Sequence, residues 1–225
     1  MMRQTAIQET GHASQDGSIA DHTIAARSIA DRSQRAGRAR YLALQGGIAI
    51  AATALVALCA HISIPLGFTP VPITLQPFAV LMLGLLLAPE VSFAALSLYL
   101  LEGTVGLPVF SPHGAGGIAQ LLGPTGGYLL AAPFAAAVAG LVYRDGKRRF
   151  LSALAAAALG DLILLSIGAL WLGALVHTSF SALLSQAVVP FLASDAVKVL
   201  AAATCAQIFA SFSGAPSAKH SSQAE

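Results

Sequence analysis

Charged side chains are scarce in this sequence of 225 residues. Asp, Glu, Lys and Arg make up 10% of it, whereas a soluble globular domain carries about 25%. Twelve of these charges lie in residues 1–40 and 214–225, so only ten remain for the 173 residues in between. Ten charges are too few to cover a globule in water, which disfavours a soluble enzyme and a nucleic-acid-binding protein. The hydrophobic content of 56% instead indicates a polytopic membrane protein.

Cysteines and catalytic motifs are also few or missing. The two cysteines, Cys59 and Cys205, each lie in an apolar run, where they are typical of small buried residues rather than of a disulfide or a metal pair. The sequence contains no Walker A motif, no HExxH and no GxSxG. Its internal histidines, His61, His113 and His177, have no metal-ligand spacing. We therefore expect no enzymatic activity, no metal site and no cofactor.

The apolar runs predict an all-α integral membrane protein with six transmembrane helices. Crossing a bilayer takes about 20 apolar residues, and runs of about this length occupy residues 41–60, 126–143, 150–176 and 186–212. Two shorter runs, 74–88 and 91–101, are expected to form tilted, bent or re-entrant helices. We therefore expect a six-helix membrane domain over residues 41–213. The polar residues 1–40 lack the apolar stretch of a signal peptide and predict a disordered tail, and residues 214–225 form a second tail.

Basic residues predict the orientation of these helices. Five arginines lie between Arg27 and Arg40, and four basic residues lie between Arg144 and Arg149. Six crossings place both clusters on one side, which the positive-inside rule makes cytoplasmic, together with both termini. The outer face of the plasma (inner) membrane then carries the loops 61–73, 103–125 and 177–186. These loops are rich in Gly and Pro yet apolar. We expect them to fold over the helices and cap a ligand site, or else merely to pack on the bundle.

Three charges fall inside predicted helices, where each costs a few kcal/mol unless it is paired or hydrated. Asp195 and Lys198 are three residues apart and share one helix face. They offer a carboxylate acceptor and an ammonium donor to a solute, or form a structural ion pair. Asp161 lies near the middle of the fifth predicted helix. It is a third polar group of a site, a partner of Lys198, or a protonated carboxyl group.

Small residues recur every four positions along the first predicted helix. Gly47 and Ala51 form one series, and Ala49, Thr53 and Ala57 form another. Such faces let helices approach closely in lipid. They predict either packing within this chain or a docking surface for another membrane protein.

Four stretches of the sequence form a recognisable series. These are Ile62-Ser-Ile-Pro-Leu-Gly-Phe-Thr-Pro-Val-Pro-Ile-Thr-Leu-Gln76, Gly106-Leu-Pro-Val-Phe-Ser111, Leu122-Gly-Pro-Thr-Gly-Gly-Tyr-Leu129 and Ser194-Asp-Ala-Val-Lys198. They resemble the BioY family, the biotin-binding S components of energy-coupling factor (ECF) transporters, and the similarity extends from residue 41 to residue 212. Pro77 stands where many relatives carry Asn or Thr.

The resemblance implies high-affinity binding of biotin for uptake. It also implies two partners in the membrane assembly, a transmembrane coupling subunit and a pair of ABC-type ATPases. Asp195 and Lys198 are expected to contact the ureido ring, and the docking surface is expected at Ala49, Thr53 and Ala57. The expected substrate-binding residues are Thr74, Gln76, Phe110, Gly117, Tyr128, Trp171, Asp195 and Lys198.

Three other functions remain open from the residues alone. The same fold could bind another vitamin or a biotin precursor. An intramembrane enzyme could use Asp161 together with Asp195. A purely structural membrane subunit would bind no ligand.

Overall fold

The computed structural model describes residues 5–145, 149–177 and 179–213. The chain divides into two units, Met1–Gly47 and Ile48–Glu225. Within the described residues, eight helices and one two-stranded hairpin follow one another, so the expected all-α class is confirmed. The elements are α1 (Thr5–His61), β1 (Ser63–Ile64), β2 (Ile73–Thr74), α2 (Gln76–Leu86), α3 (Pro89–Thr104), α4 (Gly117–Leu121), α5 (Gly126–Asp145), α6 (Phe150–Val176), α7 (Phe180–Ala187) and α8 (Val189–Ser213).

Four stretches of helix are long and apolar enough to cross a membrane. They are Gln34–His61, Gly126–Arg144, Phe150–Val176 and Phe180–Phe212. The helices α2 and α3 have 11 and 16 residues and are shorter than a full crossing, as the sequence predicts. A proline stands in the first turn of each, where its missing N–H has no helical partner to lose.

Two segments differ from the sequence-based expectations. The tail over residues 1–40, expected to be disordered, is helical from Thr5, the first residue of α1. It contains no proline that would interrupt a helix. The expected loop 177–186 contains most of α7, whose first turn is capped by the Ser179 hydroxyl accepting from the Ala182 N–H. The tail 214–225, Lys147 and Arg148 lie outside the described residues.

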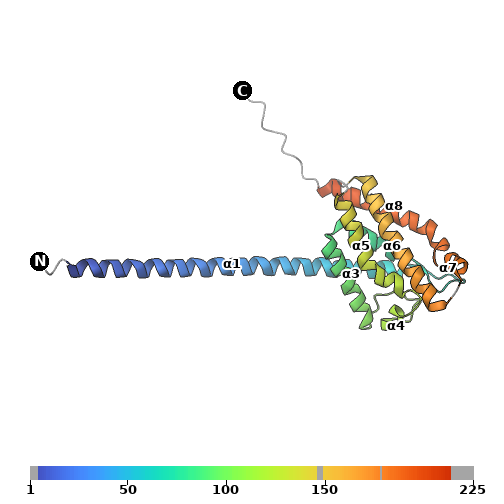
Figure 1. Ribbon diagram of the computed structural model, residues 1–225, viewed down its shortest axis with the longest axis horizontal. Coiled ribbons are helices and arrows are strands. Elements are labelled where there is room, and N and C mark those ends of the chain that lie inside the picture. Colours follow the sequence, from blue (N-terminus) through green and yellow to red (C-terminus); the bar gives the residue numbers. More distant parts are fainter. Residues whose placement is uncertain (1–4, 146–148, 178, 214–225) are drawn as a thin grey trace, which may run out of the picture. The chain divides into compact units, whose positions relative to one another are not determined.

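Small residues form much of the contact between helices in the second unit. Ala135, Ala139, Ala156 and Ala157 are fully buried, and α5 and α6 lie side by side (Figure 1). The contact between α2 and α5 is closer still. A methyl group on Gly84 would lie 2.5 Å from the Ala136 carbonyl oxygen. The helices therefore pack backbone to backbone, as small residues allow in lipid.

Large apolar side chains cover the outside of the same helices. Phe134 on α5, Leu162 and Leu170 on α6, and Val197 on α8 are each more than half exposed. An exterior of this kind is costly in water but is the normal surface of a helix in a bilayer.

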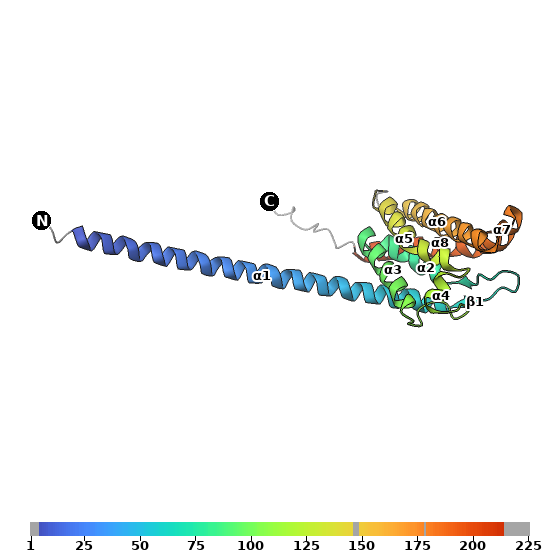
Figure 2. The ribbon, with the colours of Figure 1, turned by 60° about the horizontal axis from the view of Figure 1, so that its bottom comes forward.

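Two hydrogen bonds tie loops to helices, and a hairpin orders a third loop. The Tyr99 hydroxyl donates to the Val109 carbonyl at 3.0 Å. The Trp171 Nε1–H donates to the Gly123 carbonyl at 2.9 Å. The antiparallel hairpin pairs Ser63 with Thr74. This hairpin and α7 lie at one end of the second unit, away from the C-terminal end of α5 (Figures 1 and 2). The loops are therefore fixed parts of that end.

We predict that Gly84→Ala lowers the melting temperature of the detergent-purified protein. The added methyl group meets backbone rather than a flexible side chain, and such overpacking costs about 1–3 kcal/mol. Gly67→Ala is the matched control, because nothing lies within 4 Å of its added methyl group. A thermal-shift assay checks the difference. Equal melting temperatures for the two variants would contradict the close contact of α2 with α5.

Candidate ligand-binding site

A pocket opens within the second unit, at the end that carries the hairpin. Its empty space, including the open mouth, is about 680 Å³. Its wall is made by the hairpin, the loop before α4, α4 itself and the helices α2, α5, α6 and α8. The apolar and aromatic lining residues are Val71, Pro72, Pro77, Val80, Tyr128, Leu129, Ala132, Leu164, Leu165 and Phe191. The polar ones are Thr74, Gln76, Ser111, Gln120, Thr125, Asp161, Asp195 and Lys198.

One end of the pocket holds an ion pair on α8. The Lys198 Nζ donates to the Asp195 Oδ1 at 2.7 Å, and the two residues are only 6% and 4% exposed. The spacing of three residues places both side chains on one face of the helix, as the sequence predicts. Ser194 extends the pair, because its hydroxyl lies 3.4 Å from both the Lys198 Nζ and the Asp195 Oδ1. The pair is therefore bonded internally and also faces the pocket.

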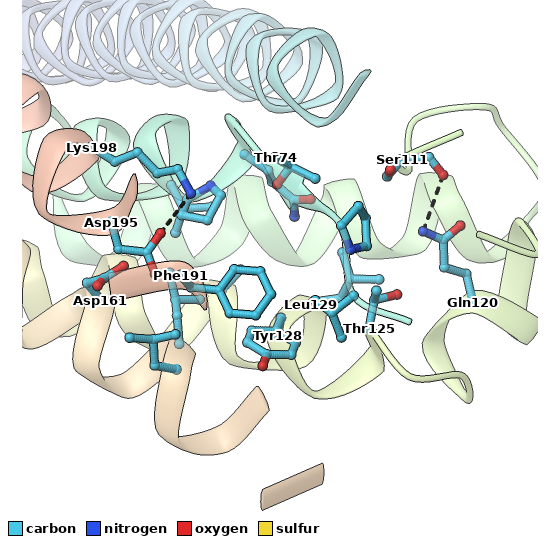
Figure 3. A pocket seen from close by; sticks show the side chains of 18 residues that line it. Thr74, Ser111, Gln120, Thr125, Tyr128, Leu129, Asp161, Phe191, Asp195 and Lys198 are labelled. Carbon is cyan, nitrogen blue, oxygen red and sulfur yellow. Dashed lines mark hydrogen bonds and ion pairs between the residues drawn. The ribbon is translucent and has the colours of Figure 1, made fainter. Parts of the chain in front are cut away.

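Asp161 on α6 adds a second carboxylate to this end. It lines the pocket and lies within electrostatic range of both Asp195 and Lys198. Among the described residues, Lys198 forms its ion pair with Asp195 and not with Asp161. Figure 3 shows Asp161, Asp195 and Lys198 gathered at the same end of the pocket. This end therefore carries two acidic groups and one basic group.

The opposite end of the pocket is polar but uncharged. Gln120 is 4% exposed, and its Nε2 donates to the Ser111 carbonyl at 3.4 Å (Figure 3). Its Oε1 accepts from the Gly116 N–H at 3.2 Å, which orders the loop before α4. The Ser111 hydroxyl lies on the pocket, is buried, and has no hydrogen-bond partner in the part of the chain that the structure describes. A buried hydroxyl without a partner is unfavourable and is available to a ligand.

An apolar stretch separates these two ends. Phe191, Tyr128 and Leu129 lie between the charged group and Ser111 in Figure 3. The pocket thus fits an elongated solute with a hydrogen-bonding head, an apolar middle and a second polar end. Two carboxyl groups and one ammonium group face the charged end, and the ammonium group is already paired with Asp195, so this end offers no unpaired cation to an anionic group of the solute.

The comparisons with known proteins agree on one family. A sequence model of the BioY family matches residues 36–214. This chain belongs to the BioY family. With four helices that are long and apolar enough to span a bilayer, this BioY family member is a multi-pass membrane protein.

Individual BioY relatives align with this chain over most of their own length. A probable biotin transporter BioY from Pyrococcus horikoshii is 41% identical over 154 residues, which are 68% of this chain and 88% of the relative. A biotin transporter BioY from Thermotoga maritima is 40% identical over 154 residues, with the same coverage of both chains. Among solved structures, the S component for biotin from an ECF-type ABC transporter matches with a TM-score of 0.70 and 26% identity. That match covers 76% of this chain and 93% of the other.

Five of the eight substrate-binding residues expected for this BioY family member line the pocket. They are Thr74, Gln76, Tyr128, Asp195 and Lys198. Thr74 and Gln76 are brought there by the end of the hairpin and the start of α2. Tyr128 contributes its ring to the wall, while its hydroxyl donates to the Ala187 carbonyl at 3.0 Å and so ties α5 to α7.

The other three expected residues, Phe110, Gly117 and Trp171, lie outside the pocket lining. Phe110 is buried against Tyr99, with ring centroids 5.4 Å apart in an edge-to-face arrangement. Gly117 starts α4 with a φ of +58°, a conformation that favours glycine. Trp171 donates to the Gly123 carbonyl. Phe110 and Trp171 therefore hold loops in place, and Gly117 allows the backbone to turn into α4.

The expected docking residues on α1 face inward. The Thr53 hydroxyl is buried and lies within hydrogen-bond distance of two acceptors, the Ile50 carbonyl at 3.0 Å and the Glu102 Oε1 at 3.2 Å. Ala49 and Ala57 are half-buried against the apolar core. This face therefore packs within the chain, which is the alternative that the sequence left open. The exposed residues of this helix include Ala51, from the other small-residue series.

Most of the other lining residues were not among the expected site residues, including Ser111, Gln120, Thr125 and Phe191. Phe191 lies four residues before Asp195, so helix periodicity placed it on the same face. Ser111 and Thr125 belong to the segments that resemble the family, but nothing local showed which of those side chains face inward. Gln120 gave no signal beyond being polar in an apolar loop. Among the described residues, no group of three or more His, Cys, Asp or Glu could hold a metal ion.

We predict that Lys198→Met destabilises the ligand-free protein by about 3–5 kcal/mol, because it leaves the Asp195 carboxylate buried without its cation. The double variant Asp195→Leu/Lys198→Met should be more stable than the single one, since it also removes the unpaired carboxylate. Thermal unfolding in detergent, without ligand, measures both. A double variant that is no more stable than Lys198→Met would show that the pair is not coupled in this way.

Proposed function

We propose that this chain is the substrate-binding membrane subunit of an ECF-type importer and that it takes up biotin. The observation that carries the proposal is the Asp195–Lys198 pair at one end of the pocket, in a chain of the BioY family. The protein is a transporter subunit and not an enzyme. We propose that it needs no cofactor of its own, because partner ATPases supply the energy for transport.

Biotin has the chemistry that the two ends of the pocket require. Its ureido ring has two N–H donors and one carbonyl acceptor. Asp195 uses Oδ1 for Lys198, but a carboxylate has about four acceptor positions and keeps some for a ligand. The Lys198 ammonium group has three donors, so one can reach the ureido carbonyl while others hold Asp195 and Ser194. The ureido ring therefore fits the charged end.

The carboxylate of biotin then lies at the uncharged end. The charged end offers it no unpaired cation, whereas the Ser111 hydroxyl and the Gln120 amide group are neutral donors. The thiophane ring and the valeryl chain lie between the ends, against Phe191, Tyr128 and Leu129. In this arrangement, Thr74 and Gln76 contact the ligand from the hairpin side. Phe110 and Trp171 act indirectly, by holding the loops, and Gly117 by allowing the turn into α4.

The finer membrane arrangement is part of the same proposal. We infer six crossings of the membrane. The short helices α2 and α3 each make one of them, either because the bilayer is thinner around them or because bent connections at their ends complete the crossing. Both termini, the tails 1–40 and 214–225, and the basic residues Arg144 and Arg149 are cytoplasmic. The hairpin, α4 and α7 lie on the outer side of the inner (plasma) membrane. A pocket at that end is open to biotin arriving from outside.

Transport requires the partners of an S component, a transmembrane coupling subunit and ABC-type ATPases. Because Ala49, Thr53 and Ala57 pack inward, we assign the docking face to the exposed side of α1, which includes Ala51, Ala54 and Leu58. Small exposed residues there let a partner helix approach closely. We propose no interaction with nucleic acid.

The first experiment is equilibrium binding of labelled biotin to the detergent-purified protein and to Asp195→Asn. We expect tight binding by the unmodified chain and an affinity about 10- to 100-fold lower for the variant, since hydrogen bonds to charged groups are worth about 1.5–3 kcal/mol. Glu102→Gln is the matched control. Its carboxylate is half-buried and contacts Thr53 but does not line the pocket, so its affinity should match that of the unmodified chain.

Competition decides between biotin and other vitamins. Desthiobiotin keeps the ureido ring and should displace labelled biotin, whereas thiamine and riboflavin should not. Displacement by either of these two, or binding unchanged in Asp195→Asn, would refute the proposed site.

A further inference from the structure

The Asp161 carboxylate is buried at the pocket with no partner of its own. The residue is 8% exposed and lines the pocket from the middle of α6. Within the described ranges, no hydrogen bond or ion pair joins its carboxylate to another residue. A carboxylate that is largely buried is costly unless a polar group bonds to it. A ligand in the pocket is the partner that the geometry provides.

The neighbouring side chains Asp195 and Lys198 are already bonded to each other, so among the described side chains at this end Asp161 is the group that remains free to bind a ligand. Asp195 already accepts from Lys198 through Oδ1. Lys198, in turn, is engaged by Asp195 at 2.7 Å. Asp161 faces the same end of the pocket as this pair but shares none of its bonds (Figure 3). The charged end therefore has a surplus of one acceptor group.

A surplus of acceptors selects a ligand head with a surplus of donors. A cyclic urea has one carbonyl and two N–H groups. Lys198 serves the carbonyl, Asp195 accepts from one N–H, and a second acceptor is required for the other. We propose that Asp161 accepts a hydrogen bond from one ureido N–H of biotin, and that it is thereby a specificity-determining residue. This inference rests on the proposed function, since it takes the ureido ring to lie at the charged end.

The test pairs a change in the protein with a change in the ligand. Asp161→Ala removes the acceptor, and each of the two mono-N-methyl derivatives of the ureido ring removes one N–H donor. Binding of biotin and of both derivatives is measured for the unmodified protein and for Asp161→Ala in detergent. We expect Asp161→Ala to lower the affinity for biotin about 10- to 100-fold. One of the two derivatives should bind the unmodified protein with an affinity lower than that of biotin by a similar factor. Its affinity should then fall little further in Asp161→Ala, because the same hydrogen bond is already missing.

Two variants control for structural effects. Glu102→Ala removes a carboxylate outside the pocket and should leave all three affinities unchanged. Asp161→Asn keeps an acceptor oxygen and loses the charge, so its affinity for biotin should lie between those of Asp161→Ala and the unmodified protein. Because Asp161 holds no other described residue, both Asp161 variants should melt without ligand at or above the temperature of the unmodified protein.

Each other outcome overturns the proposal. If Asp161→Ala lowers the affinity for biotin and for both derivatives by the same factor, the effects of the two changes are independent. That result would show that Asp161 does not contact the ureido N–H groups. Unchanged affinity would show that it lies outside the contact. A variant that fails to fold would show that the carboxylate supports the structure instead. If the unmodified protein binds no biotin, the proposed function fails and this inference fails with it; biotin binding without the coupling refutes the inference alone.

Discussion

The cost of a charge or an unpaired polar group away from water governs this structure. A helix surface that faces lipid must be apolar, and Phe134, Leu162, Leu170 and Val197 give it that character. Charges are then tolerated only where they bond to one another or line a polar cavity. Asp195 and Lys198 satisfy both conditions at once, because they form an ion pair and face the pocket. The site is therefore placed where the bundle can tolerate charge.

The helices that pack closely against one another also line the open pocket. Glycines and alanines bring α2, α5 and α6 together at Gly84, Ala136 and Gly160. Toward the hairpin end, the wall is made by larger residues and by loops. Hydrogen bonds from Tyr99 and Trp171 hold those loops. Such anchoring prepares the polar end of the pocket before a ligand arrives, which reduces the ordering cost of binding.

The sequence predicted those features that depend on local periodicity. The spacing of Asp195 and Lys198 fixed their common helix face, and the scarcity of charge identified the membrane class. It could not decide features that depend on tertiary contacts. Phe110 and Trp171 looked like wall residues, yet they hold loops in place. Thr53 belongs to a face that could pack either within this chain or against another membrane protein. Its burial and its contact with Glu102 show that the face packs within the chain. The unpaired state of Ser111 likewise depends on the folded loop.

The central claim is that the pocket binds biotin with the ureido ring at the charged end. The most direct measurement is an experimental structure of the detergent-purified protein with biotin bound. The account predicts the ureido ring against Asp195 and Lys198, and the carboxylate beside Ser111 and Gln120. A ligand bound in the reverse direction, or outside this pocket, would contradict it.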